Sequence, residues 1–244
     1  MSWEWRIFFN ENDYDLWKHL AEDNQECKSI INNEPINKFH DYYTDVKNDD
    51  YGLKERWILK SGEYIPFIEL KFRMKVDNKI KTELWEKIIS NEIKEPIKEE
   101  EGLNINQLSD SLRTSIHYST LENKTHIEKI LTTINRVGLE RIFIEKERKQ
   151  IRGKYIKKDK KWEFKRGNDR LSAPLENNNA ILIEQSNIIS LQTGNQVLSK
   201  LRSICLETKK NTKVIKKFID NYIKFSEYYL MSYPKLIQNP DIIT

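Results

Sequence analysis

The chain has 244 residues, of which 33% are charged and 38% are hydrophobic, and its formal net charge is +4. An aromatic content of 11% and so small a net charge exclude an intrinsically disordered chain. No apolar run reaches the roughly 20 residues that cross a bilayer, and the N-terminus has no apolar signal core. We therefore expect a folded cytoplasmic protein without a membrane partner, and Cys27 and Cys205 match no zinc spacing.

The first part of the chain alternates apolar and polar residues, as strands do when successive side chains point to opposite faces. The pattern is clearest in Ile68–Arg73, Ile-Glu-Leu-Lys-Phe-Arg, which has one apolar and one charged face. Ser61-Gly62 is typical of the turn of a hairpin. The sequence predicts a helix over Glu11–Asn24 and strands over Met1–Asn10, Phe39–Val46, Gly52–Lys60 and Tyr64–Lys75.

The periodicity then changes to that of helices. Apolar residues recur every four positions across Asn78–Lys94, which predicts a helix that Pro96 ends, because proline lacks a backbone donor. A second helical stretch follows over Leu108–Asn135. We expect this section, residues 78–135, to pack outside a sheet and not to form a separate domain.

The last part predicts strands over Leu139–Ile151, Ala180–Ser186 and Gln196–Glu207, and then a helix over Thr212–Phe225. The segment Lys154–Arg170 is very basic and carries interleaved aromatic residues. Basic residues beside aromatic ones can bind RNA. The simpler interpretation is a solvated hairpin, and we favour it because runs of charge are weak signals.

Strands and helices that alternate without regular βαβ spacing predict an α+β fold. Charged residues recur on one face of several strands, and we interpret these faces as the lining of a shared polar interior. Residues 1–244 are therefore predicted to form one domain, an antiparallel β-barrel with helices packed outside. The candidate inward-facing bases are Arg6, Lys54, Arg56, Lys71, Arg73, Lys146 and Arg148, and the candidate acids are Glu4, Glu69, Glu184 and Glu207.

Six short motifs follow one another along the chain. They are Tyr42-Tyr43-Thr44-Asp45, Lys54-Glu55-Arg56, Glu69-Leu70-Lys71, Lys146-Glu147-Arg148, Cys205-Leu206-Glu207 and Ser232-Tyr233-Pro234-Lys235-Leu236. Their order resembles that of the CYTH superfamily, the triphosphate tunnel metalloenzymes. This family includes thiamine triphosphatases, inorganic triphosphatases, class IV adenylate cyclases and fungal-type RNA triphosphatases. The likeness spans nearly the whole chain.

The resemblance implies a hydrolase that depends on Mg²⁺ or Mn²⁺ and acts on inorganic triphosphate, a nucleoside triphosphate, thiamine triphosphate or an RNA 5′-triphosphate. The bases would bind the phosphates, since arginine and lysine keep their charge at neutral pH. The four acids would bind the metal through oxygen. Glu4 and Glu207 are the implied catalytic residues, whereas Glu69 could instead brace the lysines.

Two departures from the family pattern leave an alternative open. Ser2 stands where the opening motif of the family has its first Glu, and Cys205 stands at the first position of its late Glu-x-Glu. The loss of these acids favours a module that keeps the cationic tunnel and binds polyanions without catalysis. An adenylate cyclase-like enzyme is a further alternative, but the sequence identifies no site for a base and a ribose.

Overall fold

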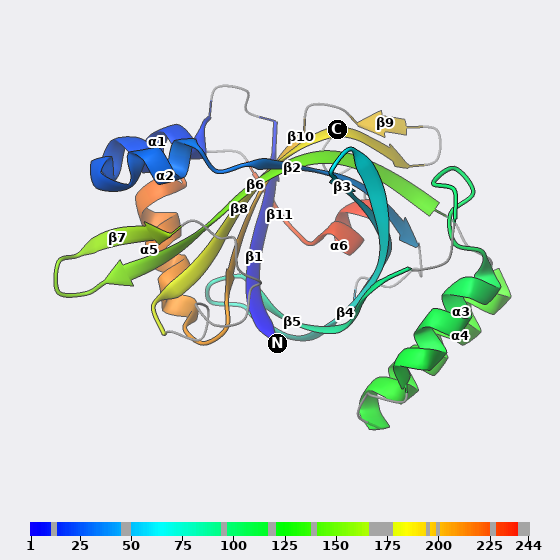
Figure 1. Cartoon of the computed structure of the whole chain (residues 1–244). Coiled ribbons are helices and arrows are strands. Elements are labelled where there is room, and N and C mark those ends of the chain that lie inside the picture. The colour runs from blue at the N-terminus through cyan, green and yellow to red at the C-terminus, as the bar shows by residue number, and fades with distance from the viewer. Residues whose placement is uncertain are drawn as a thin grey trace.

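A closed antiparallel β-barrel organises the computed structural model (Figure 1). The structure describes residues 1–10, 14–44, 50–93, 97–116, 121–137, 141–165, 178–193, 196–198, 201–224 and 228–238. Around the ring, the strand order is β6 (Arg141–Ile156), β2 (Ile36–Thr44), β3 (Tyr51–Lys60), β4 (Glu63–Asp77), β5 (Thr82–Glu92), β1 (Ser2–Phe9), β10 (Leu201–Thr208) and β8 (Ala180–Thr193). Strand β8 pairs with β6 and closes the ring, so the predicted α+β barrel is confirmed.

The hairpin of β3 and β4 forms where the sequence predicts it. Ser61 has a φ of 51° and Gly62 a φ of 90°, the left-handed conformations that two-residue hairpin turns require. Lys60 therefore pairs with Glu63, and the register continues as far as Tyr51 opposite Phe72. This register fixes which face of each strand carries its charged residues.

Three helices cover one side of the barrel: α1 (Leu16–Asp23), α2 (Lys28–Asn32) and α5 (Thr212–Tyr222), with a short 3₁₀ turn, η1 (Gln25–Cys27), between the first two. The Asp15 carboxylate accepts hydrogen bonds from two backbone amides of α1, which begins there. Apolar residues of β1, among them Trp5 and Ile7, pack against Leu20 and Phe218 of these helices. The predicted helix over Glu11–Asn24 is observed from Leu16, and its residues 11–13 lie outside the described residues.

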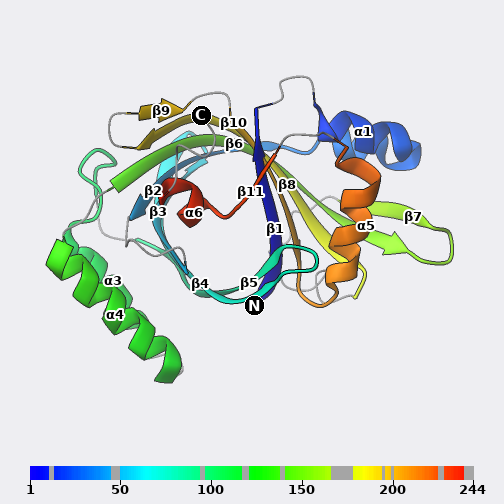
Figure 2. The same cartoon turned by 180° about the vertical axis from the view of Figure 1, so that it is seen from behind.

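The other pair of helices, α3 (Ile105–Ile116) and α4 (Leu121–Val137), lies beside the opposite side of the barrel in Figure 1 and Figure 2. The apolar face of β4, including Ile68 and Leu70, packs against Leu112 and Ile130 of these helices. Helices packed outside the sheet are therefore confirmed for this part of the chain. None of the helices in the described ranges is long and apolar enough to cross a membrane.

The predicted helix over Asn78–Lys94 is wrong, because residues Thr82–Glu92 form strand β5. The reason lies in the spacing that favoured a helix. Residues four apart also share one face of a strand, since four is a multiple of the strand period. The β4–β5 hairpin turns at Lys81, which has a φ of 55°.

The C-terminal segment returns into the ring. Strand β11 (Tyr229–Leu230) pairs with β1, and helix α6 (Tyr233–Gln238) lies within the outline of the ring in Figure 1 and Figure 2. Tyr233 and Leu236 pack against Phe8, Tyr43 and Leu201. Apolar side chains therefore fill one end of the barrel interior, and the charged side chains are left to the rest.

The basic segment forms a hairpin as far as the structure describes it, from β6 into β7 (Lys161–Lys165). Trp162 and Phe164 are buried in the core beneath α5, so these rings do not form an open stacking surface. This arrangement agrees with the simpler interpretation. RNA binding stays an untested prediction, and residues 166–170 lie outside the described ranges.

Strand β9 (Gln196–Leu198) extends the sheet beside β8.

Candidate functional site

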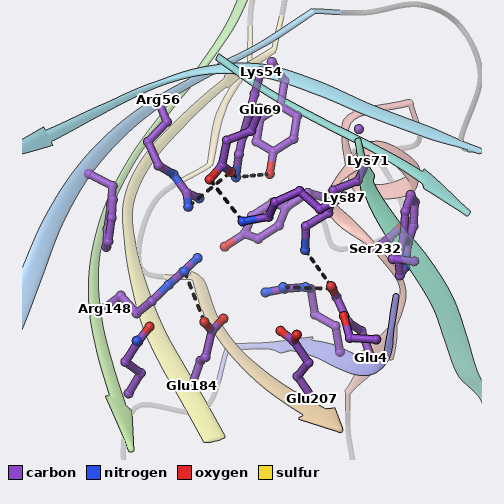
Figure 3. Close-up of a pocket in the computed structure, with 18 of the residues that line it drawn as sticks. Glu4, Lys54, Arg56, Glu69, Lys71, Lys87, Arg148, Glu184, Glu207 and Ser232 are labelled. Atoms are coloured by element: carbon purple, nitrogen blue, oxygen red, sulfur yellow. Dashed lines mark hydrogen bonds and ion pairs between the residues drawn. The ribbon is translucent and has the colours of Figure 1, made fainter. Parts of the chain in front are cut away.

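The charged faces of the barrel strands surround a cavity of about 480 Å³ (Figure 3). All eight strands of the ring contribute to its wall, together with the start of the C-terminal helix. Among the described residues, the wall carries seven basic side chains, Arg6, Lys54, Arg56, Lys71, Lys87, Arg148 and Lys209, and four acidic ones, Glu4, Glu69, Glu184 and Glu207. A partly enclosed wall with this excess of positive charge favours an anionic ligand.

Nine of the eleven residues that the sequence selects line this cavity. Arg73 and Lys146 are not part of its wall, which corrects the predicted placement of Arg73. Arg73 forms ion pairs with Asp50 at 2.5 Å and Glu83 at 3.0 Å, next to a register shift that redirects the end of β4. Lys146 faces inward but is fully buried against Asp41. The roles of the nine residues in binding and catalysis stay predictions.

The carboxylate of Asp41, on β2, holds the cations of one wall in place. It accepts hydrogen bonds from Arg56 Nε at 2.7 Å and Nη2 at 2.9 Å, from Lys54 Nζ at 3.4 Å, and from Lys146. Burial alone would raise the pKa of Asp41, but Arg56, Lys146 and Lys54 together hold it well below its ordinary value. Asp41 is therefore ionised and orients these side chains.

Glu69, on β4, completes this wall. Its carboxylate forms ion pairs with Lys54 at 3.1 Å, Arg56 at 3.3 Å and Lys87 at 3.7 Å. Burial and the nearby positive charge of Arg56 lower the pKa of Lys54 to about 8, although Asp41 and Glu69 oppose that shift. Lys54 is thus a cavity cation whose charge changes near neutral pH.

The opposite wall carries the other three carboxylates (Figure 3). Lys71 donates a hydrogen bond to Glu4 at 2.6 Å, and Arg148 donates one to Glu184 at 3.2 Å. Glu207 lies across from Glu4 in the β1–β10 register. Burial and the negative charge of Glu4 raise the pKa of Glu207, and within the described ranges no cation lies at ion-pair distance from it.

Three of the cavity arginines lie over the faces of two aromatic rings. The guanidinium carbons of Arg56 and Arg148 lie 4.8 Å and 5.0 Å from the centre of the Phe39 ring. Arg6 lies 4.8 Å from the centre of the Tyr233 ring. Such contacts attract a cation to the ring face and limit its rotamers. Phe39 and Tyr233 therefore help to fix the direction in which the cavity cations point.

Two of the cavity acids, and not a larger group of them, are suited to bind a divalent cation. No group of three acidic, histidine or cysteine side chains that could hold a metal occurs in the part of the chain that the structure describes. Mg²⁺ usually takes one or two carboxylates, with the remaining ligands from water and substrate phosphates. Glu4 and Glu207 lie opposite each other in the β1–β10 register and fit that requirement, although Lys71 and Arg6 also pair with Glu4.

Sequence reasoning missed several residues of this site, among them the cavity cation Lys209, which directly follows β10. Lys87 was assigned to a helix, although the alternation of Glu83, Trp85 and Lys87 on one face would have located it. Asp41 was missed because it is a lone acid in a strand rich in aromatic residues. Ser232 lies in a matched motif, but no role was assigned to it.

Comparisons with known proteins bear on the fold. No protein-family model and no curated protein matches the chain. A Hippeastrum protein that was proposed to be an adenylyl cyclase, and is described as having a dominant triphosphatase activity, aligns with a TM-score of 0.53 at 12% identity over 98% of this chain and 96% of its own. Proteins of Pyrococcus horikoshii OT3 and Pyrococcus furiosus align at 14% identity with TM-scores of 0.44 and 0.45, over 97% and 96% of this chain and 99% of each of theirs. At such identities the likeness to the Hippeastrum protein establishes a shared barrel fold alone.

Proposed function

We propose that this chain is a divergent member of the CYTH superfamily and a metal-dependent hydrolase of a triphosphate-bearing substrate. The observation that carries the proposal is the convergence of seven basic and four acidic side chains on one cavity of about 480 Å³. A chain of phosphates has the negative charge that such a cavity attracts. The triphosphatase activity described for the Hippeastrum protein, which has the same fold, supports the proposal.

The chain's own residues would act mainly by positioning charge. Arg56, Lys54 and Arg148 point into the cavity before any ligand arrives, held by Asp41, Glu69 and neighbouring groups. Donors that are fixed in advance stabilise developing charge without reorganising during the reaction. The proposal therefore assigns these cations to the phosphates, and Glu184 and Glu69 to the support of the cations.

Glu4 and Glu207 are the residues that would hold Mg²⁺ or Mn²⁺. When bound, such an ion offsets phosphate charge and lowers the pKa of a water molecule that attacks phosphorus. Lys71, which donates to Glu4 at 2.6 Å, would keep the Glu4 carboxylate aimed at the cavity and bind a phosphate oxygen on its other side. An ammonium group has three donors, so it can serve both partners.

A second candidate function is a module that binds triphosphates without hydrolysing them. The observation that favours it is the environment of Cys205, which is 1% exposed and lies between Arg6 of β1 and Glu184 of β8 in the strand register. A thiol stands there among the acids, and only two carboxylates remain suited to a metal. Turnover decides between the two functions.

The test is phosphate release from inorganic triphosphate, nucleoside triphosphates, thiamine triphosphate and 5′-triphosphorylated RNA, with Mg²⁺, with Mn²⁺ and with a chelator. We expect metal-dependent release from at least one substrate. Lys71→Gln should lower kcat/KM at least tenfold, because it removes one of the cations proposed to contact the phosphates. The matched control Lys75→Gln, on the same strand but exposed and outside the cavity, should leave it unchanged.

Calorimetry with each of the four substrates separates the remaining outcomes. Tight binding in the chelator, without turnover in either metal, would replace the hydrolase with the binding module. Absence of both binding and turnover for all four substrates would reject both functions.

A further inference from the structure

A second cavity, of about 280 Å³, adjoins the first. The two share the side chains of Glu4, Arg6, Trp85 and Ser232. The rest of its described wall comes from the β4–β5 hairpin and from the segment around β11, and consists of Val76, Asn78, Lys81, Glu83, Leu230, Met231 and Lys235. The two cavities are therefore adjacent, as the two parts of one elongated ligand would require.

Ser232 marks the junction of the two cavities. The residue is 5% exposed, and within the described residues its buried hydroxyl oxygen has no hydrogen-bond partner. A buried polar group without a partner costs free energy, so a ligand toward which this hydroxyl can turn would relieve that cost. Figure 3 places Ser232 on the same side of the first cavity as Glu4 and Lys71.

The wall of the second cavity differs in character from that of the first. Val76, Leu230 and Met231 supply apolar surface, as does Trp85, whose ring is fixed by a hydrogen bond from Nε1 to Glu83 at 3.1 Å. Val76 is 42% exposed, which is unusual for a large apolar side chain of this protein. Such a mixture suits an organic group and not a further phosphate.

The charges of this wall select among organic groups. Arg6, Lys81 and Lys235 outnumber Glu4 and Glu83, so a cationic ring is disfavoured. A neutral ring system with polar edges can use the exposed amide of Asn78. A volume of about 280 Å³ lies at the lower end of the range that holds whole ligands, so it suits one part of a larger ligand.

We propose that the second cavity binds the nucleoside of a nucleoside triphosphate whose phosphates lie in the first cavity. Ser232 and Arg6 then contact the phosphate next to the nucleoside. This assignment rests on the proposed function and narrows its substrate class, since inorganic triphosphate leaves the second cavity unused. It also supplies the site for a base and a ribose that the sequence does not reveal.

The experiment compares the four common nucleoside triphosphates with inorganic triphosphate, by steady-state kinetics and by calorimetry. Val76→Trp fills the second cavity from a position that is already partly exposed. We expect it to lower the ratio of kcat/KM for the preferred nucleoside triphosphate to that for inorganic triphosphate about tenfold. Met74→Trp, at a residue of the same strand that is 37% exposed and outside both cavities, should leave the ratio unchanged.

Failure of this assignment differs from failure of the proposed function. A wild-type protein that binds and hydrolyses only inorganic triphosphate keeps the function but overturns the nucleoside subsite. An unchanged ratio in Val76→Trp overturns it as well, whether both substrates lose activity equally or neither does. If the wild type binds without turnover, the test compares the dissociation constants of the nucleoside triphosphate and of inorganic triphosphate. Val76→Trp should then weaken binding of the nucleoside triphosphate alone.

Discussion

The position of Asp41 makes a demanding test of the barrel interior. Asp41→Asn keeps the shape of the side chain and removes its charge, which leaves Arg56, Lys54 and Lys146 without the carboxylate that they share. The side chain of Lys146 is 0% exposed, and those of Lys54 and Arg56 are 10% and 9% exposed, so none can regain water without movement of the barrel.

The size of the loss follows from these contacts. Removal of one partner from a buried ion pair costs about 3–5 kcal/mol. Two features favour the lower end: Lys54 keeps Glu69 at 3.1 Å, and burial already lowers the pKa of Lys146 well below its ordinary value, so Lys146 can lose its proton. We therefore expect Asp41→Asn to lower the free energy of unfolding by about 3 kcal/mol at pH 7.

Urea unfolding at pH 7, followed by circular dichroism, measures this difference. The control is Asp220→Asn, where the carboxylate is 54% exposed and pairs with Lys216 four residues earlier at 2.8 Å. An exposed helical pair of this kind contributes about 0.3–0.5 kcal/mol. A loss below about 1 kcal/mol for Asp41→Asn, within the ordinary range of single substitutions, would refute the view that this acid organises the cations.

The pH dependence gives an independent check on the same residue. The folded-state pKa of Asp41 is depressed, so its contribution to stability is present above the unfolded value of about 3.9 and is lost as the pH falls through the folded value. Asp41→Asn should therefore lose less stability on acidification than the wild type. Parallel acid profiles for the two proteins would contradict the depressed pKa.

Two further predictions concern the cavity itself. Lys54, with a pKa of about 8, loses its charge as the pH rises, so the affinity for inorganic triphosphate measured by calorimetry should fall between pH 7 and pH 9. An affinity that does not change with pH, or a fall in affinity that persists in Lys54→Met, would count against this. Glu207→Gln should raise the Tm in a chelator, because burial and Glu4 disfavour the charged form, and should abolish stabilisation by Mn²⁺. A lower Tm in the chelator would indicate that Glu207 is stabilised by a partner in the metal-free protein.

The sequence predicts the inward faces of β1, β3 and β4 well. Glu4 with Arg6 on β1, and Glu69 with Lys71 on β4, alternate with apolar residues because one side of each strand meets the cavity and the other meets the core beneath the helices. Wherever both environments are continuous, the period of two is complete and the prediction follows. The order of the motifs adds the closure of the sheet, which alternation alone cannot supply.

The rest of the site depends on quantities that periodicity does not contain. Alternation assigns Lys146 and Arg148 to the same face, but it gives no depth along the barrel, and one residue is buried beneath the cavity while the other lines it. A spacing of four fits a helix and a strand equally, so the sequence predicts neither β5 nor the inward position of Lys87. The second cavity forms between a hairpin and the C-terminal segment, far apart in sequence, and no local pattern identifies it.

The acids of the barrel interior explain why Arg56 and Arg148 can both remain charged although they lie close together. Arg56 and Arg148 share the Phe39 ring, and like charges at such a distance repel unless acids oppose them. Asp41 and Glu69 form ion pairs with Arg56, and Glu184 forms one with Arg148. Each guanidinium charge is therefore balanced by an acid of the barrel while the side chain still lines the cavity. An incoming phosphate then meets donors whose rotamers are already fixed, and its binding need not supply the free energy that orders them. For this reason the acids of the cavity wall matter as much to anion binding as the bases that would contact the phosphate.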